Sequence, residues 1–198
     1  MIKDFVINNS MNIVKENKKY DQEQLEEIKY GLESIYLLLT KFVVIFTISI
    51  VLGLLKESLL FFLFFNILRT TAFGIHASKS IYCWISSIIC FIALPYISKI
   101  VILPNIFFII SSSLSIILFI IYAPADTIKR PLINAKKRKI YKIVTILSSL
   151  ILTTLIFVIK SNIIKNLIIF AMILQVILIL PITYKIFKLP YNNYKNYK

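Results

Sequence analysis

Residues 102–122 read ILPNIFFIISSSLSIILFIIY, a run without a charged side chain. A helix that crosses a bilayer needs roughly 20 mainly apolar residues, so this stretch is long enough to span one. Further apolar segments of similar character lie near residues 37–55, 58–68, 81–100, 143–159 and 166–184. The sequence therefore predicts an all-α, polytopic transmembrane protein with about six membrane segments.

The composition agrees with this fold class. Hydrophobic residues make up 59% of the 198 residues and charged residues 16%, against ~45–50% and ~25% in an ordinary soluble domain. This balance disfavours a water-soluble enzyme, a disordered chain and a nucleic-acid-binding module. Two cysteines are too few for a disulfide framework, and His76 is the only histidine.

The segment 58–68 is the shortest of the six. Its apolar run ends at Asn66 and Arg69, so the helix either takes up polar residues at its inner end or re-enters the membrane without crossing it. Irregular backbone at membrane depth is tolerated only where protein or a water-filled cavity surrounds it. A short or re-entrant segment is therefore typical of a functional site.

The first 35 residues form a polar region of mixed charge. Asp21 and Gln24 form a capping-box pattern, and apolar residues follow it at helical spacing. Residues 2–17 predict another amphipathic helix, which lies either on the membrane surface or against the protein's own body. We therefore expect cytoplasmic or interfacial helices at 1–35 and a transmembrane helical domain at 36–198.

The distribution of Lys and Arg predicts the topology. Cytoplasmic loops are enriched in these residues, which puts the basic loop 123–142 and the C-terminal tail on the cytoplasmic side. Six crossings place the N-terminal region and residues 69–80 on the same side. The net charge of +14 suits anionic lipid headgroups or an acidic partner, and no nucleic acid is needed to explain it.

The stretch 69–84 interrupts the apolar pattern and holds both His76 and Cys83. An imidazole within hydrogen-bond reach of a thiol favours the reactive thiolate. On a straight helix the two Cα atoms would be ~10.5 Å apart, too far for contact. Gly74 lets the backbone turn, so we expect His76 on a bend folded back over the helix that carries Cys83. The alternative is a packing cysteine and an ordinary surface histidine.

Other residues of this part of the chain have open interpretations. Arg69 either extends to the headgroups or holds a carboxylate or a developing oxyanion. Asp126 either orients His76 as a third group or closes a turn before the basic run. We predict no metal site, because His76, Cys83 and Cys90 recur along a line of roughly 21 Å. Cys90 is expected to pack in the apolar interior.

Two motifs carry a family resemblance: the loop APADTIKRP at 123–131, and the spacing of Arg69, Gly74, His76, Ala77 and Cys83. Both resemble the accessory gene regulator protein B (AgrB) membrane peptidases, which process the precursor of a cyclic autoinducing peptide in quorum sensing. Size and hydropathy are similar over nearly the whole chain. Phe73 stands where many members of the family have a second glycine.

The resemblance implies a cysteine endopeptidase that needs no cofactor. Cys83 would attack a backbone carbonyl of the precursor, and His76 would accept the thiol proton. Arg69, Gly74 and Asp126 would support the site. An internal residue of the precursor would then displace Cys83 from the thioester and close a thiolactone or lactone ring. Restricted access of water would protect the thioester.

The resemblance also implies a binding partner for the basic loop. Precursors in the family carry an amphipathic helix and an acidic C-terminal tail, and that tail could be held by Lys129, Arg130, Lys136, Lys137, Arg138 and Lys139. The ordinary charge bias of cytoplasmic loops explains the same residues without a substrate. The expected partners are an AgrD-like precursor and membrane lipids, and the apolar faces are compatible with a homodimer.

We expect a multi-pass protein of the bacterial cell membrane with its active site near the cytoplasmic face. The competing interpretation is a non-enzymatic membrane transporter or scaffold, in which His76 and Cys83 are incidental. A transporter predicts paired polar residues deep in several spans. The deep positions here are mostly Ile, Leu, Phe and Ser.

Overall fold

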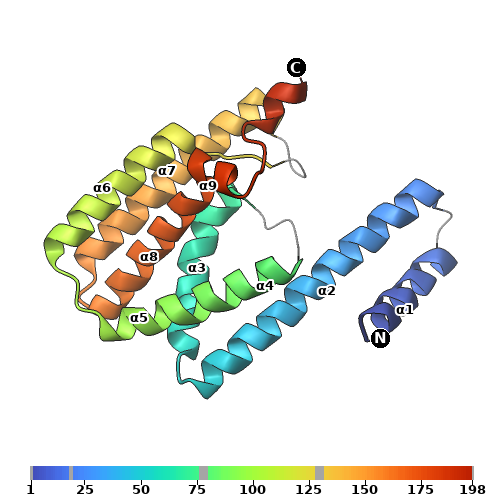
Figure 1. The fold of residues 1–198 in the computed structure, drawn as a ribbon, viewed down its shortest axis with the longest axis horizontal. Coiled ribbons are helices and arrows are strands. Elements are labelled where there is room, and N and C mark those ends of the chain that lie inside the picture. Colours follow the sequence, from blue (N-terminus) through green and yellow to red (C-terminus); the bar gives the residue numbers. More distant parts are fainter. Residues whose placement is uncertain (1, 18–19, 76–79, 128–131, 198) are drawn as a thin grey trace. The chain divides into compact units, whose positions relative to one another are not determined.

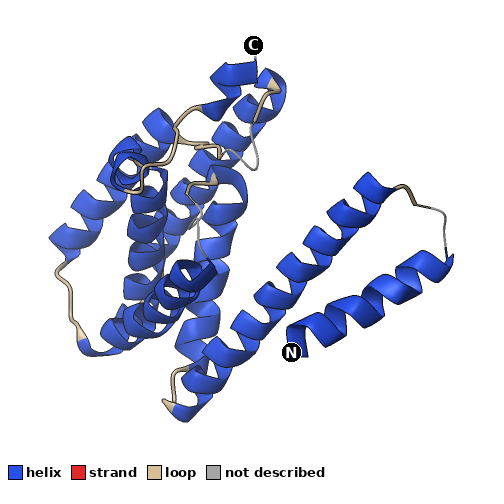
Figure 2. Ribbon diagram, turned by 45° about the vertical axis from the view of Figure 1, so that its right-hand side comes forward, coloured by secondary structure: helices blue, strands red, loops and turns tan. Residues whose placement is uncertain are grey.

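The computed structural model describes residues 2–17, 20–75, 80–127 and 132–197. Within these ranges the chain forms helices and no strand (Figures 1 and 2), so the predicted all-α class is confirmed. The elements in chain order are α1 Ile2–Asn17, α2 Gln22–Val51, α3 Leu55–Ala72, α4 Ser80–Ile88, the π-helix η1 Ile89–Ala93, α5 Leu94–Ile100, α6 Asn105–Tyr122, α7 Ala135–Val158, α8 Asn162–Ile179, α9 Pro181–Ile186 and the 3₁₀-helix η2 Asn193–Tyr197.

Several helices are long and apolar enough to cross a membrane. Among the described residues there are four of them: Gln24–Val51 within α2, and the whole of α6, α7 and α8. A shorter apolar helical stretch covers Trp84–Ile100. These helices contain or overlap five of the six apolar segments that the sequence predicts, whereas the segment 58–68 lies in α3, which is not among them. The all-α polytopic membrane fold is confirmed.

The chain divides into two compact units, Met1–Ile48 and Ser49–Lys198. In the first unit, α1 lies alongside α2 (Figures 1 and 2). The predicted capping box starts α2: Asp21 Oδ1 accepts the N–H of Gln24 at 2.8 Å, and Gln24 Oε1 accepts the N–H of Asp21 at 3.4 Å. The helix then continues without a break past residue 35, so the amphipathic segment and the first apolar segment are one helix.

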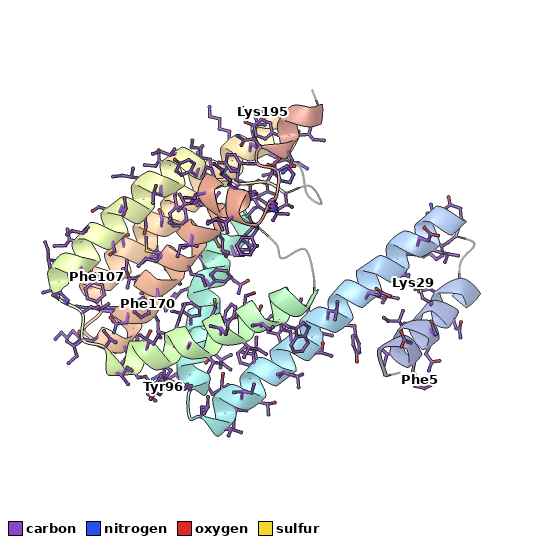
Figure 3. The ribbon with its side chains drawn as sticks, in the orientation of Figure 1. Phe5, Lys29, Tyr96, Phe107, Phe170 and Lys195 are labelled. Carbon is purple, nitrogen blue, oxygen red and sulfur yellow. The ribbon has the colours of Figure 1, made fainter. Side chains whose placement is uncertain are left out.

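Helix α8 is the centre of the second unit. It contacts α3, α5, α6 and α7. Of the residues in its 18-residue apolar stretch 50% are buried, against 22% in the corresponding stretches of α6 and α7. A helix that is apolar on all sides is one that other elements surround. Phe107 of α6 and Phe170 of α8 pack against the resulting core (Figure 3). The outer faces of α6 and α7 keep exposed isoleucine and leucine side chains, which suit contact with lipid.

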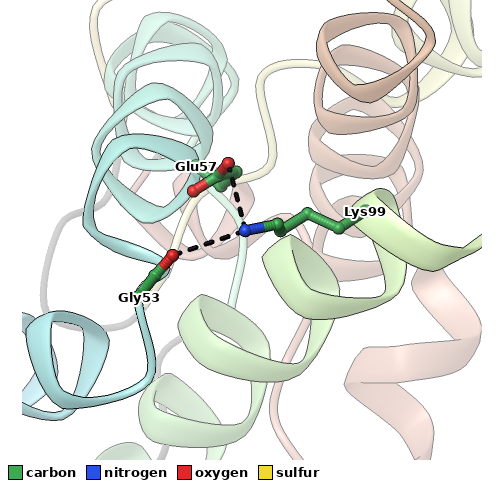
Figure 4. A network of polar contacts seen from close by, with 3 residues as sticks. All are labelled: Gly53, Glu57 and Lys99. Atoms are coloured by element: carbon green, nitrogen blue, oxygen red, sulfur yellow. Dashed lines mark hydrogen bonds and ion pairs between the residues drawn. The ribbon is translucent and has the colours of Figure 1, made fainter.

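The short segment 58–68 lies inside an unbroken helix. Helix α3 runs from Leu55 to Ala72, so it includes polar residues at both ends. Crossing and re-entry of this segment both stay open as predictions. At its N-terminal end, Lys99 Nζ of α5 lies 3.6 Å from Glu57 Oε1 and donates to the Gly53 carbonyl oxygen at 3.4 Å (Figure 4). The turn before α3 is thereby tied to α5.

The predicted segment 81–100 is helical but not uniform. A π-helical turn at Ile89–Ala93, which contains Cys90, separates α4 from α5. Pro95 is the second residue of α5, and proline has no N–H to donate to the carbonyl four residues earlier. Tyr96 lies on the outer side of this stretch and is exposed (Figure 3). The widened turn thus coincides with a position where the regular α-helical bonding cannot continue.

Candidate functional site

Three segments that are far apart in sequence meet just after α3. The N–H of Gly74 donates to the Ala125 carbonyl oxygen at 2.8 Å, and the N–H of Ala125 donates to Ala72 at 3.0 Å. The N–H of Ile75 donates to the carbonyl oxygen of Leu178, at the end of α8, at 3.0 Å. We call residues 73–75 with these partners the 73–75 junction. It fixes the chain immediately before His76.

Gly74 is needed at this junction for two physical reasons. Its φ angle is +104°, a conformation that side chains with a Cβ rarely adopt. A Cβ built on Gly74 would lie 2.6 Å from the Leu178 carbonyl oxygen and 2.8 Å from Arg69 Nη1. The chain therefore turns out of α3 at the residue that the sequence singles out for a bend.

Phe73 shares the unusual backbone geometry. Its φ angle is +57°, a region that favours glycine over larger residues. The phenyl ring packs edge-on against Tyr141 of α7, with ring centroids 5.1 Å apart, and such aromatic pairs contribute about 0.5–1.5 kcal/mol beyond their buried area. This contact offsets part of the cost of a non-glycine residue at position 73.

Arg69 and Gln175 hold the same turn through side-chain hydrogen bonds. The Arg69 guanidinium donates to the carbonyl oxygens of Phe73 and Ile75, the latter at 2.7 Å. Gln175 Nε2 of α8 donates to the Phe73 carbonyl oxygen at 2.8 Å. The structure thus gives Arg69 a backbone-holding contact in addition to the roles that the sequence leaves open.

Gln175 is a site residue that sequence reasoning missed. Its side chain is fully buried, and its Oε1 atom has no hydrogen-bond partner among the described residues. The available signal was its chemistry, because an amide in the apolar run of α8 is costly unless it serves a purpose. We interpret it as a positioning residue for the 73–75 junction.

Asp126 connects the loop after α6 to the C-terminal segment. Its side chain is 2% exposed. Oδ1 accepts the N–H of Asn193 at 2.9 Å, and Oδ2 accepts the N–H groups of Tyr194 at 2.8 Å and of Leu132 at 3.4 Å. Tyr184 of α9 donates its hydroxyl to the Asp126 carbonyl oxygen at 3.0 Å. Asp126 therefore holds the C-terminal segment against the loop that also carries Ala125.

The predicted dyad lies at the edge of what the structure describes. His76, with its expected bend and its contact with Cys83, falls outside the described residues. Cys83 lies in α4, which begins at Ser80, so it is on a helix as expected. Four residues separate Ile75 of the junction from Ser80. Cys90 lies in the π-helical turn and is half-buried.

The described basic residues of the loop form two groups, whereas Lys129 and Arg130 fall outside the described residues. Lys136 and Lys137 are exposed in the first turn of α7, whose N-terminus is capped by Asn134 Oδ1, which accepts the N–H of Lys137 at 3.1 Å. The next two residues, Arg138 and Lys139, line a pocket between α6, α7 and the C-terminal segment.

Fold and site together define a polytopic all-α membrane protein with a buried polar junction where α3, α8 and the loop after α6 meet. The accessory gene regulator B family matches residues 7–179. The chain belongs to that family.

Similar proteins cover most of the chain. An AgrB-like protein of Clostridium acetobutylicum is 34% identical over 187 residues, which is 93% of this chain and 90% of the relative. An AgrB-like protein of Listeria monocytogenes is 35% identical over 188 residues, covering 94% and 91%. The accessory gene regulator protein B of Staphylococcus carnosus is 35% identical over 135 residues, covering 68% and 70%. No solved structure matches the chain.

The family match confirms the resemblance that the sequence motifs indicate. It supports a role for this protein in the accessory gene regulator (agr) quorum-sensing system. The matched residues include α3, the 73–75 junction, α4 and α8.

The geometry of the 73–75 junction predicts that Gly74→Ala lowers the free energy of unfolding. We expect a loss of roughly 1–3 kcal/mol, the usual cost of a strained backbone position, because the added Cβ collides with Leu178 and Arg69. Gly31→Ala is the matched control, since a Cβ at that helical position meets nothing within 4 Å. Thermal unfolding of the detergent-solubilised protein, followed by far-ultraviolet circular dichroism, measures both. Equal midpoints for the two variants would contradict the geometry described here.

Proposed function

We propose that the protein is a membrane-embedded cysteine endopeptidase that removes the C-terminal part of an AgrD-like signalling precursor. Cys83 is the nucleophile and His76 the general base in this proposal. The observation that carries it is the 73–75 junction, because its hydrogen bonds hold the backbone directly before His76. A general base must be held within hydrogen-bond reach of the proton that it accepts.

The reaction proceeds in two acyl-transfer steps. His76 accepts the thiol proton, and the Cys83 thiolate attacks the scissile carbonyl carbon of the precursor. The carbon–nitrogen bond breaks, His76 returns the proton to the leaving amine, and the acyl group remains on Cys83 as a thioester. An internal thiol or hydroxyl of the precursor then gives its proton to His76 and attacks the thioester carbon. The bond between that carbon and the Cys83 sulfur breaks as the ring closes, and His76 passes the proton to the sulfur and regenerates the Cys83 thiol.

The second step costs little free energy when the product is a thiolactone. Exchange of one thioester for another is nearly isoenergetic, whereas direct conversion of a peptide bond to a thiolactone is uphill. Splitting the reaction at a covalent intermediate divides one difficult step into two easier ones. Exclusion of water near Cys83 would keep hydrolysis from consuming the intermediate.

The supporting residues act through the backbone in this proposal. Arg69 and Gln175 hold the Phe73 carbonyl, and Gly74 permits the close approach of α8. Asp126 fixes the loop that carries Ala125, which accepts the hydrogen bond from Gly74. These residues preorganise the segment before His76, and preorganisation lowers the entropic cost of bringing reacting groups together.

The acidic tail of the precursor is bound by the exposed cations of the loop in our proposal. Among the described residues we assign this role to Lys136 and Lys137, and Lys129 and Arg130 belong to the same basic run. Arg138 and Lys139, which the sequence groups with them, line the pocket discussed below. We place the site near the cytoplasmic face of a bacterial cell membrane, where positively charged loops accumulate.

The dyad is tested without a substrate by the reactivity of the two cysteines. We expect Cys83 to alkylate well below the ordinary thiol pKa of ~8.5, because the imidazole of His76 stabilises the thiolate. His76→Ala should remove this reactivity. The measurement is peptide mass spectrometry after iodoacetamide treatment across a pH series in nanodiscs, with Cys90 as the internal control. If Cys83 reacts no faster than Cys90 and ignores His76→Ala, a preformed dyad is absent.

Cleavage itself is tested with an AgrD-like precursor and the protein in nanodiscs. Cys83→Ala should abolish release of the C-terminal tail, and Cys90→Ala should retain it. A thioester between precursor and Cys83, visible by mass spectrometry at low pH, is the expected intermediate. Tail release that persists in Cys83→Ala, or no release by the unmodified protein, would favour the scaffold interpretation.

The tail-binding role predicts a dependence on charge. Lys136→Gln combined with Lys137→Gln should weaken binding of a synthetic acidic tail peptide by roughly threefold to tenfold, as expected for exposed charge pairs. The effect should shrink as salt screens it. Lys160→Gln combined with Lys165→Gln is the matched control, because these residues lie at the connection from α7 to α8, at the opposite end of α7. Fluorescence anisotropy at two salt concentrations measures both, and equal weakening would refute the assignment.

A further inference from the structure

A basic pocket of about 530 Å³ lies between the end of α6, the start of α7 and the C-terminal segment. The α6 end contributes Tyr122 and Pro124, and the C-terminal segment contributes Tyr191 and Tyr194. The cations come from the first two turns of α7 and are Arg138, Lys139 and Lys142. The described residues that line the pocket include no Asp or Glu. Its lining therefore favours an anion.

Arg138 is held in place within this pocket. Its guanidinium carbon lies 3.7 Å from the centre of the Tyr194 ring, a cation–π contact that orients the planar group. A planar guanidinium matches two oxygens of one phosphate or carboxylate at the same time. Lys142 lies four residues further along α7, on the same helix face. The two cations thus converge from consecutive turns.

Tyr191 adds a neutral hydrogen-bond donor. Burial raises the pKa of its phenol to about 12, so the hydroxyl keeps its proton throughout the physiological range. The raised pKa destabilises the folded protein only at alkaline pH. Above the ordinary phenol pKa of 10.0 the unfolded chain loses this proton before the folded protein does. The hydroxyl can therefore donate to an anionic oxygen at neutral pH.

Exposed apolar side chains continue from the pocket along both helices. Ile121 lines the pocket itself and is 57% exposed. Ile143 of α7 is 47% exposed and lies one turn beyond Lys139 on the same face. The pocket thus lies where a cationic surface changes into an apolar one. Lipid headgroups meet acyl chains at such a boundary.

We propose that this pocket binds the phosphate of an anionic phospholipid, with Arg138, Lys139 and Lys142 around the headgroup and the acyl chains along Ile121 and Ile143. The apolar continuation distinguishes this ligand from an acidic peptide tail, which would gain nothing from exposed isoleucines. A free phosphate shares the headgroup chemistry but lacks the chains. The proposal is independent of peptidase activity, because it concerns the resting protein in its membrane.

The test is lipid binding to the full chain in detergent, followed by native mass spectrometry. The probes are phosphatidylglycerol, phosphatidylcholine with chains of the same length, inorganic phosphate and an acidic peptide. We expect phosphatidylglycerol to bind more tightly than phosphatidylcholine and inorganic phosphate to compete weakly. Arg138→Gln with Lys142→Gln should weaken phosphatidylglycerol binding roughly tenfold or more, given the contribution of each basic residue near an anionic headgroup.

The matched control is Lys136→Gln with Lys137→Gln, which removes the same charge from the same helix outside the pocket. It should leave phosphatidylglycerol binding within twofold of the unmodified protein. Arg138→Lys keeps the charge without the planar fork and should lie between the two. Circular dichroism checks that each variant remains folded.

Three results would overturn the proposal. Equal weakening by both double variants would mean that diffuse surface charge attracts the lipid. Equal affinity for phosphatidylglycerol and inorganic phosphate would mean that the apolar surface takes no part. An acidic peptide that displaces the lipid and is itself weakened by Arg138→Gln with Lys142→Gln would make the pocket a peptide site. Peptidase activity enters none of these measurements, so the proposed function can fail separately.

Discussion

Three backbone hydrogen bonds link the end of α3 to the loop after α6 and to the end of α8, and they fix the path of the chain into the site. Gly74 and Ala125 supply two of them, and Ile75 donates the third to Leu178. An unpaired N–H or carbonyl away from water costs several kcal/mol. Residues that leave a helix within such a bundle must therefore find partners on other elements. Here the close approach is possible because Gly74 has no Cβ.

The side chains around this junction extend its effect. Arg69 and Gln175 reach the Phe73 carbonyl from opposite elements, α3 and α8. Asp126 also fixes the C-terminal segment beside the loop after α6, because its carboxylate accepts hydrogen bonds from the N–H groups of Asn193 and Tyr194. α8 is thus both the core of the bundle and a wall of the candidate site. A side chain held from several directions loses little entropy when it acts, which is what a catalytic group next to the junction requires.

Local signals explain what could be predicted from the sequence. The capping box of Asp21 and Gln24 depends on neighbouring residues and is confirmed, and the apolar runs predict the membrane helices because length and composition suffice. The junction could not be predicted, since the contact of Ile75 with Leu178 joins residues about a hundred positions apart. The same holds for the hydrogen bond of Gln175 with Phe73 and for the hydrogen-bond partners of Asp126 in the C-terminal segment. The contact between His76 and Cys83 stays a prediction.

The run Lys136-Lys137-Arg138-Lys139 shows why a charge cluster in sequence need not be one binding site. Successive residues of an α-helix point about 100° apart, so four consecutive cations cannot face one ligand. Arg138 and Lys142 share a face and a pocket, whereas Lys136 and Lys137 remain exposed outside it. A helix that starts at the membrane surface can therefore present one set of charges to lipid and another to a peptide. This division follows from helical geometry together with the position of the end of α6 and of the C-terminal segment beside α7. Under the two proposals above, one basic segment holds both the lipid and the substrate.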